Sequence, residues 1–222
     1  MQHRTRVARA QSEAHPKGMH GDTLNSVTLG LLTLYGFVAL LGRTALQRLR
    51  EHDSGWRGIS GKPGSVAWWA GVLLAVSVVG LGLAPALAPA QPAVALWRVL
   101  VGGVGFGLGG VFTIYAQIAM GRSWRIGVKT GERTQLRTNG PFGWCRNPVF
   151  MGMLVTTGAL ALWVPWLLVP WALMLLSLEL QVRVVEEPHL LTTHGETYRD
   201  YARTTGRFVP GLGRGLDPSA RV

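Results

Sequence analysis

The sequence of 222 residues predicts an all-α integral membrane protein, a bundle of about five transmembrane helices that ends in a helical hairpin. Its apolar residues lie in long runs instead of at amphipathic spacing, and its basic residues gather in the connections between those runs. About 20 apolar residues span a bilayer as a helix, and only helices or closed barrels satisfy every backbone group in lipid. The runs therefore predict membrane-spanning helices.

Four apolar stretches supply the predicted spans, roughly 24–41, 66–87, 93–120 and 149–182. The last stretch holds 34 residues. That is too many for one crossing of about 30 Å at about 1.5 Å per residue, and somewhat few for two full crossings. It also contains Val164-Pro165-Trp166, so we expect a tight hairpin that turns there, at or just inside the far interface.

Basic residues set the predicted orientation and explain the formal net charge of +11. Segments 43–65, 122–147 and 183–222 hold five, six and six of the 22 lysines and arginines, whereas 85–92 holds none. The positive-inside rule makes those three segments, and so the C-terminus, cytoplasmic. Topology and anionic lipid account for this charge better than nucleic acid does. The basic residues within 1–23 oppose an outside N-terminus, so its orientation stays open.

The chain divides into three predicted parts. Residues 1–23 form a basic N-terminal tail without apolar periodicity, 24–120 hold the first three transmembrane helices, and 121–222 form the functional core. Residues 43–65 are rich in Gly and charge and are expected to form an irregular connection. Arginine outnumbers lysine 19 to 3, which is typical of a GC-rich coding sequence and indicates a bacterial source. For a bundle of membrane-spanning helices we therefore expect the bacterial inner membrane.

A glycine-rich run in the third span, Gly105-Phe-Gly107-Leu-Gly109-Gly110, formally matches a dinucleotide fingerprint. That fingerprint needs a preceding strand and a βαβ unit, which an apolar helical run does not provide. We interpret the pairs Gly103 with Gly107 and Gly105 with Gly109 as small faces that let transmembrane helices approach closely.

Two polar clusters flank the hairpin and carry the candidate chemistry. The first is the loop 136–152, which is bent by Gly and Pro and carries two arginines, and the second is Arg183-Val-Val-Glu186-Glu187. They are followed by His194-Gly-Glu-Thr-Tyr198-Arg-Asp-Tyr201 and by Arg207-Phe-Val-Pro210. The positive-inside orientation puts all of them at the membrane–cytosol boundary.

The order and spacing of these motifs over residues 118–212 resemble the superfamily of isoprenylcysteine carboxyl methyltransferases and phospholipid methyltransferases. The resemblance implies an integral membrane enzyme that uses S-adenosylmethionine to methylate a lipophilic, membrane-embedded acceptor, either a carboxylate or an amine. It also implies that the C-terminal cytoplasmic helix and the segment after it cover the cofactor. No protein partner is predicted.

The resemblance carries site residues onto matching positions of this chain. It implies cofactor binding at Leu136, Thr138, Gly140, Phe142, Arg146, Asn147, Pro148, Phe150, Glu186, Glu187 and Tyr198. It implies a reaction centre at Glu187, Arg183 and Arg207. Glu187 is the nearest candidate base for an amine acceptor, whereas an arginine would orient a carboxylate acceptor.

One position departs from the family. Relatives have Arg-His-Pro where this chain has Arg146-Asn147-Pro148. Because Asn donates and accepts hydrogen bonds but does not titrate, we keep a binding role for Asn147 and discount proton transfer. Pro148 suits the first turn of a helix, whose unpaired N–H groups favour an anionic ligand group.

Structural alternatives remain for each candidate. Arg146 could simply extend to the lipid headgroups. Glu186 and Glu187 could be a solvated start of the C-terminal segment. Glu179 could pair with Arg183 and so anchor a helix end. Tyr198 could be an interfacial packing residue. At the level of the whole protein, a sterol-reductase-like enzyme with NADPH and a non-catalytic interaction protein that keeps the fold are the rivals.

A metal site is not expected. His189 and His194 lie five residues apart without a partner cluster. The one cysteine, Cys145, excludes an intrachain disulfide and a cysteine-based zinc site.

Overall fold

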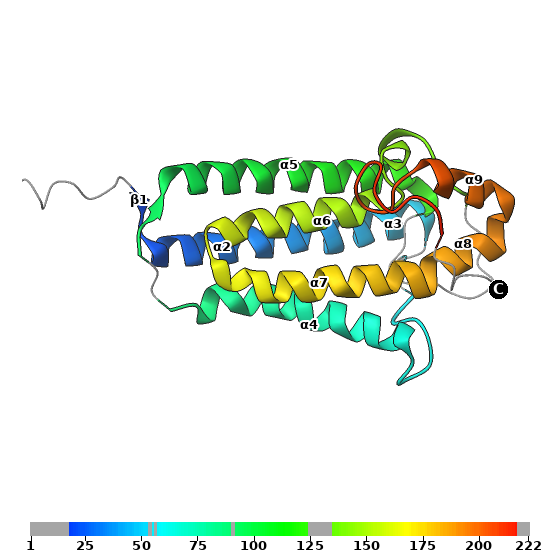
Figure 1. Cartoon of the computed structure of the whole chain (residues 1–222). Helices are drawn as coiled ribbons and strands as arrows, with labels where there is room; N and C mark the ends of the chain where they lie inside the picture. Colours follow the sequence, from blue (N-terminus) through cyan, green and yellow to red (C-terminus); the bar gives the residue numbers. More distant parts are fainter. Residues whose placement is uncertain (1–17, 53–54, 56, 90–91, 124–134, 217–222) are drawn as a thin grey trace, which may run out of the picture.

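The computed structural model describes residues 18–52, 55, 57–89, 92–123 and 135–216. In this part of the chain long helical segments run side by side along one common axis (Figure 1). The described part of the predicted N-terminal tail includes β1 (Gly18–Met19), which pairs antiparallel with β2 (Val94–Ala95). Residues 1–17 of that tail lie outside the described residues.

The first helical segment is longer than the sequence predicted. It consists of α2 (Gly21–Gly36), the π-helical η1 (Phe37–Gly42) and α3 (Arg43–Glu51), in unbroken succession. Residues 43–51 were expected to belong to an irregular connection, and for them this prediction was wrong. Gly42 alone does not end the helix, because the residues after it are good helix formers. The segment ends where His52 adopts the left-handed conformation, with a φ of 55°.

The second and third long helices fall where the apolar runs predict them. α4 (Val66–Leu87) begins at Ser65, whose hydroxyl accepts a hydrogen bond from the Trp68 N–H at 3.2 Å and so caps the helix. α5 (Leu96–Met120) starts three residues later than the expected 93, because Val94 and Ala95 belong to the short strand β2. It is followed by a short 3-10 turn, η2 (Gly121–Ser123).

The predicted hairpin is confirmed. A short 3-10 turn, η3 (Gly140–Gly143), precedes α6 (Pro148–Ala159), and the chain reverses through the 3-10 turns η4 (Leu160–Leu162) and η5 (Pro165–Leu167) into α7 (Leu168–Gln181). The Trp163 indole N–H is 3.2 Å and 3.1 Å from the carbonyls of Arg98 and Val99, which ties the turn to the start of α5. α7 continues through the π-helical η6 (Val182–Glu186) into α8 (Glu187–His194), and α9 (Glu196–Thr204) follows.

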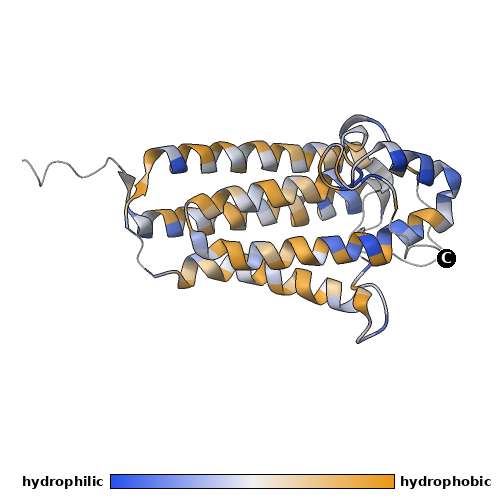
Figure 2. Ribbon diagram, in the orientation of Figure 1, coloured by the Kyte–Doolittle hydropathy of each residue, from blue (hydrophilic) through white to orange (hydrophobic). Residues whose placement is uncertain are grey.

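Four helical segments of the described chain are long and apolar enough to cross a membrane: Gly21–Leu49, Val66–Leu87, Leu96–Met120 and Pro165–His194. The helix Pro148–Leu162 is apolar but shorter. Hydrophobic residues follow the helices along the bundle, and hydrophilic residues gather at the end that holds α8 and α9 (Figure 2). We call this end the polar end and the opposite one, with β1 and β2, the far end. The prediction of an all-α integral membrane bundle with a C-terminal hairpin is confirmed.

Helices α5 and α6 pack through reciprocal Gly–Thr contacts. A Cβ atom on Gly109 would lie 2.7 Å from the Thr156 N and Oγ1 atoms, and one on Gly152 would lie 2.4 Å from Thr113 Oγ1. Each threonine hydroxyl donates to the carbonyl of the glycine one turn before it, at 2.9 Å for Thr113 and 2.7 Å for Thr156. The expected small face at Gly105 and Gly109 therefore meets α6, since Gly105 also abuts Ala159.

The companion pair, Gly103 and Gly107, does not form such a face. A Cβ atom on Gly107 would meet nothing within 4 Å. The close approach of α5 and α6 thus depends on one of the two predicted glycine pairs. It holds the loop before α6 against the polar end of α5.

We predict that Gly109→Leu destabilises the protein, whereas Gly107→Leu does not. The first change forces a side chain into the Thr156 backbone, and overpacking of this kind costs about 1–3 kcal/mol or more. The second places a good helix former where there is space. Thermal unfolding of both variants in detergent, with size-exclusion profiles, measures the difference. Equal melting temperatures would show that the two helices do not rely on this contact.

Candidate functional site

The candidate site lies at the polar end, where the loop before α6, the corner between α7 and α8, and the segment after α9 meet. A π-turn shapes the corner. Pro188 has no N–H to donate to the Val184 carbonyl, and its ring would clash with that carbonyl in a regular helix. The five residues of η6 absorb this conflict, and the side chain of Glu187 is fully buried while Arg183 is exposed.

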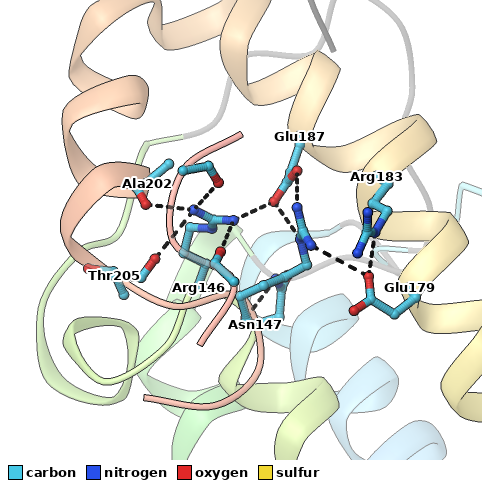
Figure 3. Close-up of polar contacts among 10 residues, drawn as sticks. Arg146, Asn147, Glu179, Arg183, Glu187, Ala202 and Thr205 are labelled. Carbon is cyan, nitrogen blue, oxygen red and sulfur yellow. Dashed lines mark hydrogen bonds and ion pairs between the residues drawn. The ribbon is translucent and has the colours of Figure 1, made fainter. Parts of the chain in front are cut away.

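Glu187 is bound by two arginines that come from distant parts of the chain (Figure 3). Arg146 Nη2 donates to Glu187 Oε1 at 2.7 Å. Arg207 Nε donates to the same oxygen at 2.9 Å, and its Nη2 donates to Oε2 at 3.0 Å. Both carboxylate oxygens are therefore occupied by charge-assisted hydrogen bonds, and the three side chains are buried.

The ion pairs continue outward to the surface. Arg207 Nη1 lies 3.7 Å from Glu179 Oε2, and Arg183 Nε donates to that oxygen at 2.8 Å. The expected pair of Glu179 and Arg183 is thus present, and it ends a chain of three arginines and two glutamates. These five side chains carry three positive and two negative charges, and Glu186, next to Glu187 in the sequence, adds a third negative charge beside them. Arg183 is the exposed end of the cluster, with 43% of its side chain accessible.

Arg146 also folds the segment 206–215, which we call the strap. Its Nη1 donates to the carbonyls of Ala202 at 2.9 Å, Thr205 at 3.3 Å and Gly215 at 3.1 Å. Its Nη2 donates to the carbonyl of Gly213 at 3.2 Å. Arg146 points into the protein instead of reaching to lipid headgroups, and its side chain joins the end of α9 to the last residues of the strap.

The backbone before α6 pairs with the first residues of the strap. Arg146 N–H donates to the Gly206 carbonyl at 2.8 Å, and Asn147 N–H donates to the Arg207 carbonyl at 3.0 Å. The Asn147 side-chain Nδ2 donates to that same carbonyl at 3.1 Å. Gly206 is required here, because a Cβ atom would lie 2.2 Å from the Val209 carbonyl oxygen. Asn147 therefore holds the strap residue that binds Glu187.

Aromatic side chains fill the space between α9, the loop and the strap. The Tyr201 hydroxyl donates to the Phe142 carbonyl at 2.5 Å, and the Tyr198 ring is buried 6.2 Å from that of Tyr201. Burial raises the pKa of both tyrosines, so both stay protonated at neutral pH. Phe150 packs on Phe208 of the strap, with ring centroids 6.5 Å apart.

The first residues of the loop lie in a different place. Leu136, Thr138 and Gly140 line a pocket of about 270 Å³ together with Tyr115 and Ala119 of α5. No member of the ion-pair cluster borders this pocket, which we call the α5 pocket. The predicted site residues thus divide into two groups at the polar end. One group lies around the ion-pair cluster and the other lines the α5 pocket. Pro148 is the first residue of α6, beside the ion-pair cluster, and Glu186, the last residue of η6, is partly exposed.

Sequence analysis missed two contributions to the site. Tyr115 gave no signal, because it stands inside an apolar helical run. The strap carbonyls gave a weak one: Gly211, Gly213 and Gly215 have φ values of 80°, 67° and 81°, which only glycine adopts readily. Among the described residues, no group of three or more His, Cys, Asp or Glu side chains is arranged to hold a metal ion.

Comparisons with known proteins add a family and a fold. Residues 97–197 match the phospholipid methyltransferase family. A solved structure of the eukaryotic intramembrane Ras methyltransferase ICMT (isoprenylcysteine carboxyl methyltransferase), without a monobody, is similar with a TM-score of 0.54 and 20% sequence identity. The similarity covers 84% of this chain but 66% of that one, so the chain spans less than two thirds of that relative. No curated protein matches the chain.

The family match covers α5, the hairpin and the corner that carries Glu187, and the likeness in fold extends over most of the chain. Both agree with the motif order seen in the sequence. Residues 97–197 thus match the phospholipid methyltransferase family, and the chain has a fold like that of the isoprenylcysteine carboxyl methyltransferase; both findings support the superfamily that the motifs resemble.

Proposed function

We propose that the protein transfers a methyl group from S-adenosylmethionine to a lipophilic acceptor embedded in the membrane. The observation that carries the proposal is the buried Arg146–Glu187–Arg207 cluster, which fixes a polar site at the end of an apolar bundle. A water-soluble donor and a membrane-embedded acceptor can meet only at such a boundary. From the distribution of basic residues we infer that this end, with the C-terminus, lies on the cytoplasmic side of a bacterial inner membrane.

The residues at the polar end fit the donor chemically. The arginines of the cluster suit the carboxylate of the donor, and buried Arg146 Nε has no hydrogen-bond partner within the described chain. Leu136, Thr138 and Gly140 offer backbone polar groups and apolar surface in the α5 pocket, while Glu186 and Tyr198 flank the cluster. When bound, S-adenosylmethionine supplies an electrophilic methyl group.

Glu187 acts in this proposal as a positioning residue. Its two oxygens accept three hydrogen bonds from arginines, so it is poorly placed to take a proton from an acceptor. Its work is to hold Arg207, and through it the strap. Arg183, at the exposed end of the cluster, is the group that an anionic acceptor can reach.

The electrostatics of the site favour a carboxylate acceptor over an amine. A carboxylate is already anionic and needs orientation instead of deprotonation. Arg183, the exposed arginine of the cluster, attracts such a group and opposes a protonated amine. Methyl ester formation is therefore the reaction type we propose, with Arg183 as the orienting residue.

Calorimetry tests the cofactor assignment. We expect S-adenosylhomocysteine to bind purified protein in detergent with a Kd near the micromolar range, about −8 kcal/mol, because the polar end offers pre-formed groups for it. NADPH in the same experiment should give no heat. Binding of NADPH alone would favour a reductase, and no heat with either ligand would favour a non-catalytic protein and contradict the proposal.

Two adjacent glutamates allow a matched test of the cluster. Glu187→Gln leaves two buried arginines without their counterion, so we expect a loss of about 3–5 kcal/mol and a melting temperature lower by about 6–20 °C. Glu186→Gln, at a partly exposed position, should stay within about 2 °C of wild type. Thermal unfolding followed by circular dichroism compares them. Similar melting temperatures would remove the structural role of Glu187.

Cys145 reports whether the strap is in place. It is buried, its backbone pairs with that of Gly206 at the start of the strap, and burial raises the pKa of its thiol to about 11. A raised pKa means less thiolate at neutral pH, about a hundredfold less than for a thiol near pKa 9. We expect N-ethylmaleimide to label native protein at pH 7 at least about a hundredfold more slowly than unfolded protein. Mass spectrometry of this sole cysteine measures both rates, and equal rates would mean that the strap does not cover it.

A further inference from the structure

A row of hydrogen bonds joins the first helical segment to α5. Both segments run from the far end to the polar end (Figure 1). The three contacts of the row each pair residues 78 positions apart: Tyr35 Oη donates to Thr113 Oγ1 at 3.1 Å, Gln117 Nε2 donates to the Ala39 carbonyl at 3.0 Å, and Arg43 Nη2 donates to the Gly121 carbonyl at 2.9 Å. Each contact lies about one helical turn beyond the one before it. The row therefore fixes one register between two parallel segments.

The π-helical turn η1 provides the middle contact. In a regular α-helix the Arg43 N–H would donate to the Ala39 carbonyl. Here that N–H donates to the Leu40 carbonyl. The Ala39 carbonyl accepts the side-chain amide of Gln117 instead, and Gln117 is buried. A π turn within an α-helix often marks a functional site, and this one lies directly before Arg43.

Arg43 is the charged end of the row and fixes the end of α5. Its side chain is buried, and its Nη1 donates to Gln47 Oε1 at 2.9 Å. Its Nη2 binds the carbonyl of Gly121, the residue after the last of α5. The last carbonyls of a helix lack donors within the helix and form the negative end of its dipole, so a buried guanidinium is favourable there. Gly121 has a φ of 57°, a conformation that favours glycine.

Gly121 connects Arg43 to the loop before α6. It is the first residue of η2, and a Cβ atom on it would lie 3.8 Å from Arg137 Nη2. Ser123, the last residue of η2, donates its hydroxyl to the Gln135 carbonyl at 3.4 Å. Gln135 and Arg137 both line the α5 pocket. The turn that Arg43 holds therefore contacts the wall of that pocket.

We propose that Arg43 is a positioning residue for the α5 pocket. By binding the Gly121 carbonyl it keeps η2 in place, and η2 contacts the loop that forms the pocket wall. Arg43 does not line the pocket itself, and it lies outside residues 97–197, which match the family. Its effect on the cofactor rests on the proposed function, because residues 136–140 of this wall are proposed to bind the cofactor. Its effect on the loop does not rest on it.

The two inner contacts of the row separate the effect of Arg43 from folding. They lie deeper in the bundle, and they keep α2 against α5 when Arg43 is replaced. Loss of the Arg43 contact then frees only the end of α5 and the turn after it. Local release of this kind speeds amide exchange in the affected segment, whereas loss of global stability speeds it throughout the protein.

Hydrogen–deuterium exchange of the full chain in detergent, without any cofactor, tests the role in the loop. The reporting amides are those that donate to carbonyls of the loop itself, at Phe142, Trp144 and Cys145. We expect Arg43→Gln to raise their exchange rates about tenfold and to leave those of α4 and α7 unchanged. Unchanged loop rates, or rates raised equally in all helices, would overturn the proposal.

Three further variants show whether the hydrogen bond is responsible. Arg48→Gln removes the same charge from an exposed position of α3 and should exchange like wild type. Arg43→Met keeps a long side chain without a donor and should match Arg43→Gln. Arg43→Lys keeps a charged donor but not the fork of two, so it should recover part of the protection. Equal rates for Arg43→Met and Arg43→Lys would mean that only packing matters, and the proposal would be wrong.

Calorimetry then connects the loop to the cofactor. We expect Arg43→Gln to weaken S-adenosylhomocysteine binding about tenfold and Arg48→Gln to change it less than about twofold. Equal affinities of wild type and Arg43→Gln would contradict the role of Arg43 in cofactor binding. If wild-type protein binds no S-adenosylhomocysteine, the proposed function fails, and the exchange rates alone decide whether Arg43 positions the loop.

Discussion

The polar end of this protein depends on one buried ionic cluster, in which Glu187 lies between Arg146 and Arg207. Taking three charges out of water costs several kcal/mol for each ion, and hydrophobic residues of similar shape often stabilise a fold as well or better. What hydrophobic residues do not provide is direction. The bidentate contact from Arg207 fixes the strap in one position, and the contacts of Arg146 fix the end of α9 relative to α6. The cluster thus serves mainly to fix the positions of the strap and of α9, and less to stabilise the fold.

Its position follows from features that belong to different levels of the structure. The Gly–Thr contacts between α5 and α6 bring the loop before Pro148 to the polar end of α5. The π-turn before Pro188 sets the corner from which Glu187 reaches inward. The strap then closes the remaining side because Gly206 allows its backbone to pair with Cys145 and Arg146. Each of these is a local backbone requirement, and together they bring three sequence segments to one carboxylate.

Sequence analysis recovered the helices because apolar runs and their lengths are dictated by the bilayer. The hairpin was predictable from the length of one run and from Pro165 within it. The length of the first helix was not, because the continuation through Arg43–Glu51 is amphipathic and depends on helix propensity instead of hydrophobicity. Four of the five members of the ion-pair cluster were predicted as site residues from motif order, and the fifth, Glu179, was expected only as a possible partner of Arg183. Their pairing was not, since Arg146 and Glu187 lie 41 positions apart and meet only through the π-turn and the strap.

The same cluster limits how a ligand can enter the polar end. Arg146 donates five hydrogen bonds from a buried side chain to Glu187 and to the carbonyls of residues 202, 205, 213 and 215. Lifting the strap would break the bonds of Arg146 to the carbonyls of residues 213 and 215 and the bidentate contact of Arg207 with Glu187, and hydrogen bonds to charged groups contribute about 1.5–3 kcal/mol each. The strap is therefore a fixed wall of the site. Access falls to the sides where polar groups are already exposed, at Arg183 and at the α5 pocket. A reaction between a soluble donor and a lipid acceptor requires two such openings on opposite chemical phases.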